Sequence, residues 1–197
     1  MRHEPPAQFR AVAGASFTGA GNWSTTANLV VRPYAASDFE QLRQLLQNIS
    51  QQARRFRFMS AFSEVPQQIL DLLANVDHHN HLALVVEAAK GSGKEIVAEA
   101  RYVGDHDDPS TCEFAITVAD QWSGQGLGGT LLAQLEALAA ANGFKTIRGE
   151  ALVDNRAMVG LARATGYRVS RHPHDPGLAC FCKDLANSLA ARLALAA

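Results

Sequence analysis

Four glycines lie within six positions of this 197-residue chain, immediately before a Leu-rich segment: Gly124, Gly126, Gly128 and Gly129. Glycine loses more conformational freedom on folding than any other residue, so such a cluster is costly in an ordered backbone. It is used where the chain needs a positive φ angle, or where another group must approach the main chain closely. The cluster therefore predicts a loop without side chains, either because its φ angles are positive or because another group approaches its backbone.

The loop lies between a predicted strand and a predicted helix. The alternating segment 111–119 precedes it and favours a strand. The helical pattern after it ends at Ala141, before the stop signal Asn142-Gly143. A helix N-terminus presents backbone N–H groups and a positive dipole, which bind a pyrophosphate without any side chain.

Three alternative roles for the glycines stay open at this point. A P-loop needs Lys after its last glycine, and Thr130 stands there instead. Gly124, Gly126 and Gly129 satisfy the dinucleotide pattern G-x-G-x-x-G, with Glu150 where a ribose-binding acid would lie, but the strands before them read as an antiparallel meander. A tight turn before a packed helix accounts for one or two glycines rather than four.

The rest of the chain predicts an α/β fold with a mixed sheet, because an antiparallel meander is followed by strand–helix–strand units. Ser37 is the expected N-cap of the first helix, with Glu40 at the capping-box spacing. Strands are expected at 29–34, 82–88, 95–103, 111–119, 145–152, 167–171 and 178–183, and helices within 37–49, 50–58, 65–76, the segment up to 141, and 154–166.

One folded domain is expected, over residues 28–184. Residues 1–27 are rich in Ala, Gly, Ser, Thr and Pro and predict a flexible tail, and residues 185–197 predict a C-terminal helix or tail. Hydrophobic residues make up 47% of the chain and charged residues 19%, which is typical of a globular protein. The formal net charge of −1 gives no indication of nucleic-acid binding, and no apolar stretch is long enough to span a membrane.

Cysteine and histidine usage points to a cytoplasmic protein without a bound metal. The chain has an odd number of cysteines, Cys112, Cys180 and Cys182, and their spacing matches neither a metal-binding nor a redox motif. No signal peptide is visible in the sequence. The His-rich segments DHHNH (77–81) and HDD (106–108) do not have the spacing of a tetrahedral site, so they are expected to be solvated turns.

The glycine segment resembles the acetyl-CoA-binding motif [QR]-x-x-G-x-[GA] of the GCN5-related N-acetyltransferases (GNAT). Placed on residues 123–128, the motif has Ser123 where the family usually has Gln or Arg, and Gln125 is the alternative source of an amide. The segments RRFRFMS, EFAITVADQWSGQGLG and GEALVDNRAMVGLARATGYRV resemble the acetyltransferase domain of bacterial protein lysine acetyltransferases that act on acyl-CoA synthetases. The resemblance covers roughly residues 29–184 and implies the GNAT fold, with a mixed, mostly antiparallel sheet flanked by helices.

This resemblance implies acetyl-CoA as cosubstrate. The backbone of 116–118 would bond the pantetheine arm like an added strand, beside a bulge that parts two strands, and the Val118 N–H would polarise the thioester carbonyl. Asn155 resembles the position that contacts the arm, and it would equally suit a helix N-cap. The implied cofactor-binding residues are Ile116, Thr117, Val118, Ser123, Gly124, Gln125, Gly126, Leu127, Gly128, Gly129, Thr130, Asn155 and Met158.

Glu113 is the candidate general base, and it resembles the catalytic Glu of the subgroup. Strand alternation places it on one face with Ala115 and Thr117, in an otherwise apolar strand. A lysine amine has a pKa of about 10.4, so a nearby carboxylate must take its proton before transfer. Burial is expected to raise the pKa of Glu113. The alternatives are a solvent-facing glutamate, or one paired with Arg101 on the neighbouring strand.

The expected reaction is direct transfer of an acetyl group to an amine. Ala162 occupies the position where many family members have a Tyr general acid, so the CoA thiolate is expected to leave unaided or with water. The expected acceptor is a lysine of a protein such as an acyl-CoA synthetase. A small amine, a non-catalytic CoA-binding module and a homodimeric assembly are the alternatives kept open.

Overall fold

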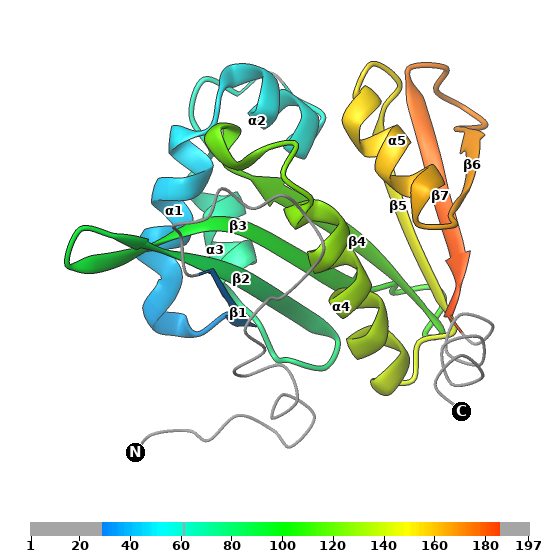
Figure 1. Cartoon of the computed structure of the whole chain (residues 1–197). Coiled ribbons are helices and arrows are strands. Elements are labelled where there is room, and N and C mark those ends of the chain that lie inside the picture. Colours follow the sequence, from blue (N-terminus) through cyan, green and yellow to red (C-terminus); the bar gives the residue numbers. More distant parts are fainter. Residues whose placement is uncertain (1–28, 61, 186–197) are drawn as a thin grey trace.

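The computed structural model describes residues 29–60 and 62–185, which form a seven-stranded sheet flanked by helices (Figure 1). The strand order is β1-β2-β3-β4-β5-β7-β6, and β4–β5 is the one parallel neighbour pair in the described residues. This arrangement confirms the predicted α/β class with a mixed, mostly antiparallel sheet. The predicted tails, residues 1–27 and 185–197, lie outside the described residues apart from Leu185.

Every predicted strand and helix of the domain is present. The strands are β1 (Val30–Pro33), β2 (His81–Lys90), β3 (Gly93–Gly104), β4 (Thr111–Val118), β5 (Thr146–Leu152), β6 (Arg168–Arg171) and β7 (Leu178–Asp184). The helices are α1 (Phe39–Asn48), α2 (Gln51–Phe58), α3 (Gln67–Ala74), α4 (Leu127–Ala141) and α5 (Arg156–Ala164), with the short 3-10 helices η2 (Ala36–Asp38) and η3 (Asp120–Trp122). None of the helices in the described part of the chain combines the length and apolar character that a membrane span requires.

The start of the first helix differs from the prediction. Ser37 lies inside η2 and makes no capping bond; instead the Asp38 carboxylate accepts a hydrogen bond from the Ala35 N–H at 2.7 Å. Arg32 on β1 holds the same carboxylate through two hydrogen bonds, of 2.6 and 2.7 Å. A contact with a neighbouring strand therefore fixes this turn.

The two faces of the sheet carry separate cores. Along β2, Leu82, Leu84 and Val86 pack into the core that α4 closes, whereas Ala83 and Val85 pack into the core that α1 and α3 close. This division follows from the alternation of side chains along a strand, and it explains why β2 is a nearly continuous apolar run. The sheet is thus fixed from both sides.

The central strands β4 and β5 pair only at their beginnings. The paired residues are Thr111 to Glu113 on β4, after which β4 continues beside β3 alone and β5 diverges from it (Figure 1). The expected bulge is not the cause, because the register between β3 and β4 is continuous from Ala98–Val118 to Gly104–Cys112. The Phe114 ring, next in the chain, lies against Gly149 of β5 where the pairing stops.

Candidate active site

A cavity of about 450 Å³ opens where β4 and β5 part, walled by α2, β4, the glycine loop, β5 and the start of α5. Of the residues predicted from the sequence, those that line it are Glu113, Ile116, Thr117, Val118, Ser123, Gly124, Gly126, Leu127, Gly128, Gly129, Asn155 and Met158. Gln125 and Thr130 are not among the lining residues, and the Gln125 side chain donates to the Gln121 carbonyl at 3.0 Å.

The four glycines serve two purposes. Gly124 and Gly126 have φ angles of +75° and +88°, which L-residues with side chains rarely adopt. Gly128 and Gly129 lie in the first turn of α4 beside α5, where an added Cβ would be 3.3 Å and 3.6 Å from the methyl groups of Leu161. Two glycines therefore bend the loop, and two let α4 and α5 approach closely.

The first turn of α4 offers open donors toward this loop. Thr130 N–H donates to the Gly126 carbonyl at 3.2 Å, but the amides of Leu127, Gly128 and Gly129 have no acceptor within the part of the chain that the structure describes. Four unsatisfied N–H groups and a positive dipole are the general properties of such a helix end. The bent loop and these amides therefore fit the diphosphate of coenzyme A.

The backbone geometry also favours another placement of the glycine motif. The segment Gln121 to Gly126 reads Q-W-S-G-Q-G, so that Gly124 and Gly126, the two glycines with positive φ, fill both glycine positions. In this placement Gln121 occupies the Gln/Arg position, and the departure at Ser123 disappears. The sequence already contained this signal, because Gln121, Gly124 and Gly126 fill all three fixed positions of the motif; the first placement was wrong by two residues.

The open edge of β4 presents amides to the cavity. Ala119 N–H donates to the Val97 carbonyl on β3 at 2.9 Å. Successive amides of an extended chain point in opposite directions, so the N–H groups of Ile116 and Val118 point away from β3, toward the gap. This is the direction that hydrogen bonding to an inserted chain requires.

Asn155 caps α5 and lines the cavity at the same time. Its Oδ1 accepts a hydrogen bond from the Met158 N–H at 3.1 Å, which confirms the predicted N-cap. The cap fixes the start of α5 at the mouth of the gap.

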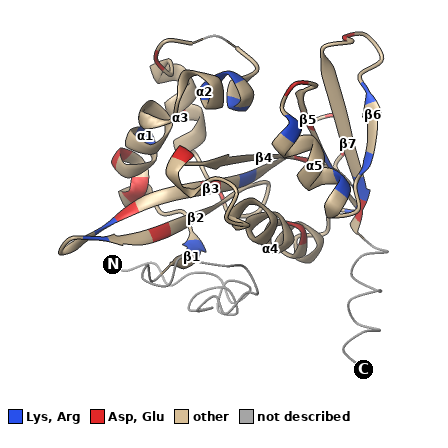
Figure 2. Cartoon of the chain, turned by 45° about the horizontal axis from the view of Figure 1, so that its top comes forward, with Lys and Arg blue, Asp and Glu red and all other residues tan. Residues whose placement is uncertain are grey.

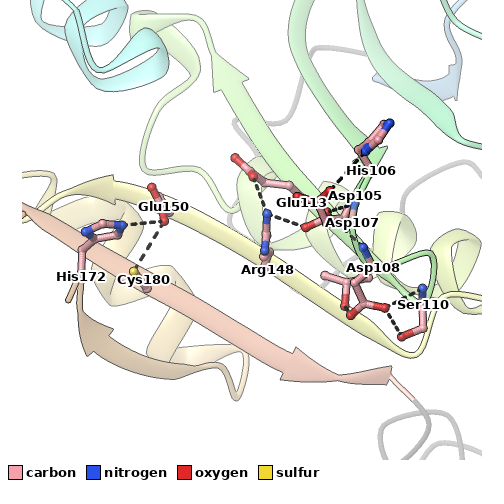
Figure 3. A network of polar contacts seen from close by, with 11 residues as sticks. Asp105, His106, Asp107, Asp108, Ser110, Glu113, Arg148, Glu150, His172 and Cys180 are labelled. Carbon is pink, nitrogen blue, oxygen red and sulfur yellow. Dashed lines mark hydrogen bonds and ion pairs between the residues drawn. The ribbon is translucent and has the colours of Figure 1, made fainter. Parts of the chain in front are cut away.

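Glu113 lies at the end of the paired region, with its side chain about half exposed (Figure 3). Arg148 on β5 comes within 3.7 Å of it but lies closer to Asp105, at 2.6 Å. The expected alternative partner is excluded, since Arg101 pairs with Glu99. The predicted alternation is confirmed, because Phe114, Ile116 and Val118 pack into the core that α4 closes, on the face opposite Glu113 and Thr117.

The surroundings of Glu113 raise its pKa, as predicted. Desolvation in the cavity is the main cause, and the negative charges of Glu150 and Asp105 act in the same direction. The positive charge of Arg148 opposes them. A carboxylate with a raised pKa is a better proton acceptor near neutral pH than an ordinary glutamate.

A second carboxylate, Glu150, lines the same cavity as Glu113, although the sequence suggested it only as the ribose-binding acid of a dinucleotide site. It contacts Cys180 Sγ and His172 Nε2, both at 3.7 Å, and these three side chains are close enough to hold a metal ion (Figure 3). However, His172 Nδ1 accepts the N–H groups of His174 and Asp175, so the ring proton is on Nε2 and faces Glu150. A metal ligand needs a free lone pair there, so the hydrogen bonds favour a carboxylate oriented by its neighbours.

Helix α2 forms a further wall of the cavity, through Ala53, Phe56, Arg57 and the adjoining Met59. Its N-cap Ser50 donates two hydrogen bonds of 2.7 Å to Asp120, just before the glycine loop. Arg55 pairs with Asp154 at 2.9 Å, beside Asn155. Both contacts join residues far apart in the chain, so local patterns could not reveal where α2 docks.

Comparison with known proteins decides what kind of site the glycine loop belongs to. The family model described as "Acetyltransferase (GNAT) family" matches residues 42–167. The chain belongs to the GNAT acetyltransferase family. It is 31% identical over 148 residues to Acetyltransferase PA5475 of Pseudomonas aeruginosa, covering 75% of this chain and 79% of that protein. This GNAT chain is therefore an N-acetyltransferase, and a P-loop and a dinucleotide site are both excluded.

The chain is also similar to two proteins named Pat. The GNAT chain is 28% identical over 128 residues to Acetyltransferase Pat of Mycolicibacterium smegmatis, which covers 65% of this chain and 38% of that protein. The crystal structure of the GNAT domain of S. lividans PAT superposes with a TM-score of 0.69 at 23% identity, over 78% of this chain and 89% of that one. This likeness confirms the GNAT fold.

Proposed function

We propose that this N-acetyltransferase moves an acetyl group from acetyl-CoA to a lysine side chain of a protein, with Glu113 as the general base. The observation that carries the proposal is the meeting of three features in one cavity: the glycine loop, the open edge of β4 and a carboxylate with a raised pKa. Acetyl-CoA supplies the activated acyl group; the chain supplies binding, orientation and proton transfer.

The loop and the start of α4 would hold the phosphates. The amides of Leu127, Gly128 and Gly129 donate to the diphosphate, and Gln121 and Ser123 add side-chain donors at the rim. The Val118 N–H, next to the loop, would bond the pantetheine arm as β-strands bond one another. Thr117 and Met158 line the gap beside the arm, and Asn155 reaches it from the start of α5.

Glu113 would prepare the acceptor. The lysine ammonium must lose a proton before its nitrogen can attack the thioester carbonyl, and the Glu113 carboxylate takes this proton directly or through water. The Ile116 N–H, which lies nearer to Glu113 along β4 than the Val118 N–H does, donates to the carbonyl oxygen and stabilises its developing charge. Ala162 is buried and has no proton to give, so the thiolate leaves unaided or with water.

A protein lysine is the proposed acceptor because the segments that resemble the protein lysine acetyltransferases include both walls of the cavity. RRFRFMS belongs to α2 and the turn after it, and the segment around Asn155 includes the end of β5 and α5. An acyl-CoA synthetase is the first protein to offer. The resemblance is thus concentrated where acceptor and cosubstrate would meet.

The test follows the release of free CoA thiol from acetyl-CoA with a panel of proteins, lysine peptides and small amines. We expect turnover with lysine acceptors, and a loss of kcat of about a hundredfold or more in Glu113→Gln at neutral pH, in line with the removal of a general base. Glu95→Gln, on the distant β2–β3 hairpin, is the matched control. Equal turnover by wild type and Glu113→Gln would show that Glu113 is not the general base. Turnover with small amines alone would contradict a protein lysine as the acceptor.

A further inference from the structure

The cavity contains a buried basic side chain to which acetyl transfer gives no role. Arg57 on α2 lines the cavity with a side chain that is only 11% exposed. Its Nε donates to Thr117 Oγ1 at 2.9 Å, which fixes the guanidinium over β4. Its Nη2 is buried and has no hydrogen-bond partner among the described residues.

The groups around Arg57 leave one positive charge in excess. Glu99 Oε2 faces Arg57 Nη2 at 3.8 Å, which is too long for a hydrogen bond, and Glu99 Oε1 is engaged with Arg101. Arg101 also contacts the Leu73 carbonyl and His81 Nε2. Burial and Arg101 lower the pKa of His81, so it is neutral at pH 7 and adds no charge. The cluster therefore consists of two guanidinium groups and one carboxylate.

A buried cation without a matching anion is unfavourable, because the low-dielectric interior replaces its water shell. Desolvation also lowers the pKa of Arg57, because burial disfavours the charged form of the guanidinium. Guanidinium binds carboxylate strongly, so an incoming carboxylate beside Arg57 would balance the excess charge.

Charges of opposite sign lie in different parts of the cavity lining. Basic residues lie on α2 (Figure 2), whereas Glu113 and Glu150 lie on β4 and β5 (Figure 3). Arg57 is anchored at Thr117, and Thr117 lies four residues beyond Glu113 on the same face, about 13 Å along a strand. This span suits a long molecule with an amine at one end and a carboxylate at the other.

We propose that Arg57 binds a carboxylate of the acyl acceptor, so that the preferred acceptor carries a carboxylate on the same molecule as its lysine amine. The inference rests on the proposed lysine acetylation and names the feature that selects among lysines. Two sources share this chemistry: a terminal carboxylate, and an acidic side chain near the lysine in a protein.

The experiment uses matched acceptors with the full chain. Nα-acetyl-lysine is compared with Nα-acetyl-lysinamide, which differ only in the terminal carboxylate. Lysine peptides with one Glu, placed in turn at the three positions on either side of the lysine, are compared with the corresponding Gln peptides. We expect kcat/KM to favour the carboxylate member of at least one pair by about tenfold to a hundredfold, as for loss of a hydrogen bond to a charged group.

The variants identify the residue. In Arg57→Gln, the ratio of kcat/KM within each acceptor pair should fall to near one, while KM for acetyl-CoA stays unchanged. Arg55→Gln makes the same change of charge on the same helix, but Arg55 does not line the cavity, so the ratio should persist in this control. A ratio near one for every wild-type pair, with lysines still acetylated, overturns this inference and leaves the proposed function standing. A preference that survives Arg57→Gln, or a change confined to KM for acetyl-CoA, also overturns it. Absence of lysine acetylation with every acceptor contradicts the proposed function itself.

Discussion

The Phe114 ring lies so close to Gly149 that a Cβ atom added to this glycine would be 2.7 Å from Phe114 Cε1. Phe114 is the first residue of β4 beyond the pairing with β5, and Gly149 holds the equivalent place on β5. The ring also packs against Tyr167, with centroids 5.4 Å apart. The Phe114 ring therefore fills the space that a side chain at position 149 would need, at the point where β4 and β5 separate.

Gly149→Ala should destabilise the protein, because the new methyl group has no room beside the buried ring. We expect a loss of about 1–3 kcal/mol in the free energy of unfolding, typical of overpacking. Denaturant unfolding measures it. Gly160→Ala in α5 is the control, since an added Cβ there meets nothing within 4 Å and alanine favours a helix. Equal stability of both variants would contradict the proposed contact.

The pH dependence of kcat/KM should respond to Arg148. Glu113 must be deprotonated to accept a proton, so activity falls as the pH drops through its raised pKa. Arg148 lowers this pKa, so Arg148→Gln should raise it further and move the acidic limb of the profile to higher pH. A pH–rate profile at saturating acetyl-CoA measures the shift.

Asp105→Asn should move the same limb in the opposite direction. The Asp105 charge raises the pKa of Glu113, so its removal lowers that pKa. Asp105 also holds Arg148 at 2.6 Å, and its removal frees Arg148 to interact with Glu113, which lowers the pKa further. Shifts of the same sign in Arg148→Gln and Asp105→Asn would show that the limb reports another group.

Glu99→Gln should strongly destabilise the fold. Glu99 is fully buried, and the change leaves Arg57 and Arg101 without their carboxylate. Breaking one partner of a buried ion pair costs about 3–5 kcal/mol. Glu95→Gln on the same strand removes an exposed pair with Lys90 and should change stability by less than about 1 kcal/mol. Urea unfolding compares the two, and similar losses would argue against a buried ionic cluster.

Gly126→Ala should strain the loop without creating a clash. The φ angle of +88° is unfavourable for alanine, and a Cβ would meet no atom within 4 Å. We expect a loss of stability of about 1–2 kcal/mol from the left-handed conformation alone. Gly129→Ala, which is helical and makes an ordinary contact with Leu161, should be tolerated. Thermal unfolding of both variants tests the difference.

The order of strands and helices was predictable because hydrophobic periodicity is local. The strand predicted at 111–119 and the helix predicted to end at Ala141 agree with β4 and α4 within one residue. The N-cap at Ser37 was wrong because Asp38 is held by Arg32, a contact between elements that a capping pattern does not contain.

The site was predictable only where it is continuous in the chain. Glu113 and the glycine loop lie in one segment, so their types and spacing could be interpreted together. Arg57 reaches the cavity from α2 through Thr117, 60 residues away, and Glu150 reaches it from β5. The placement of the motif on Gln121 is already available from the sequence pattern, and the positive φ angles of Gly124 and Gly126 support it.

An interior strand with one unpartnered side is a hazard for most proteins, because such edges recruit further strands and lead to aggregation. Here the vacant side of β4 faces a narrow space between α2 and α5 rather than open solvent. A chain that enters this space can therefore hydrogen-bond to the vacant edge as a neighbouring strand would. The walls on both sides keep this edge within a binding cavity, where it is less available to strands of other molecules.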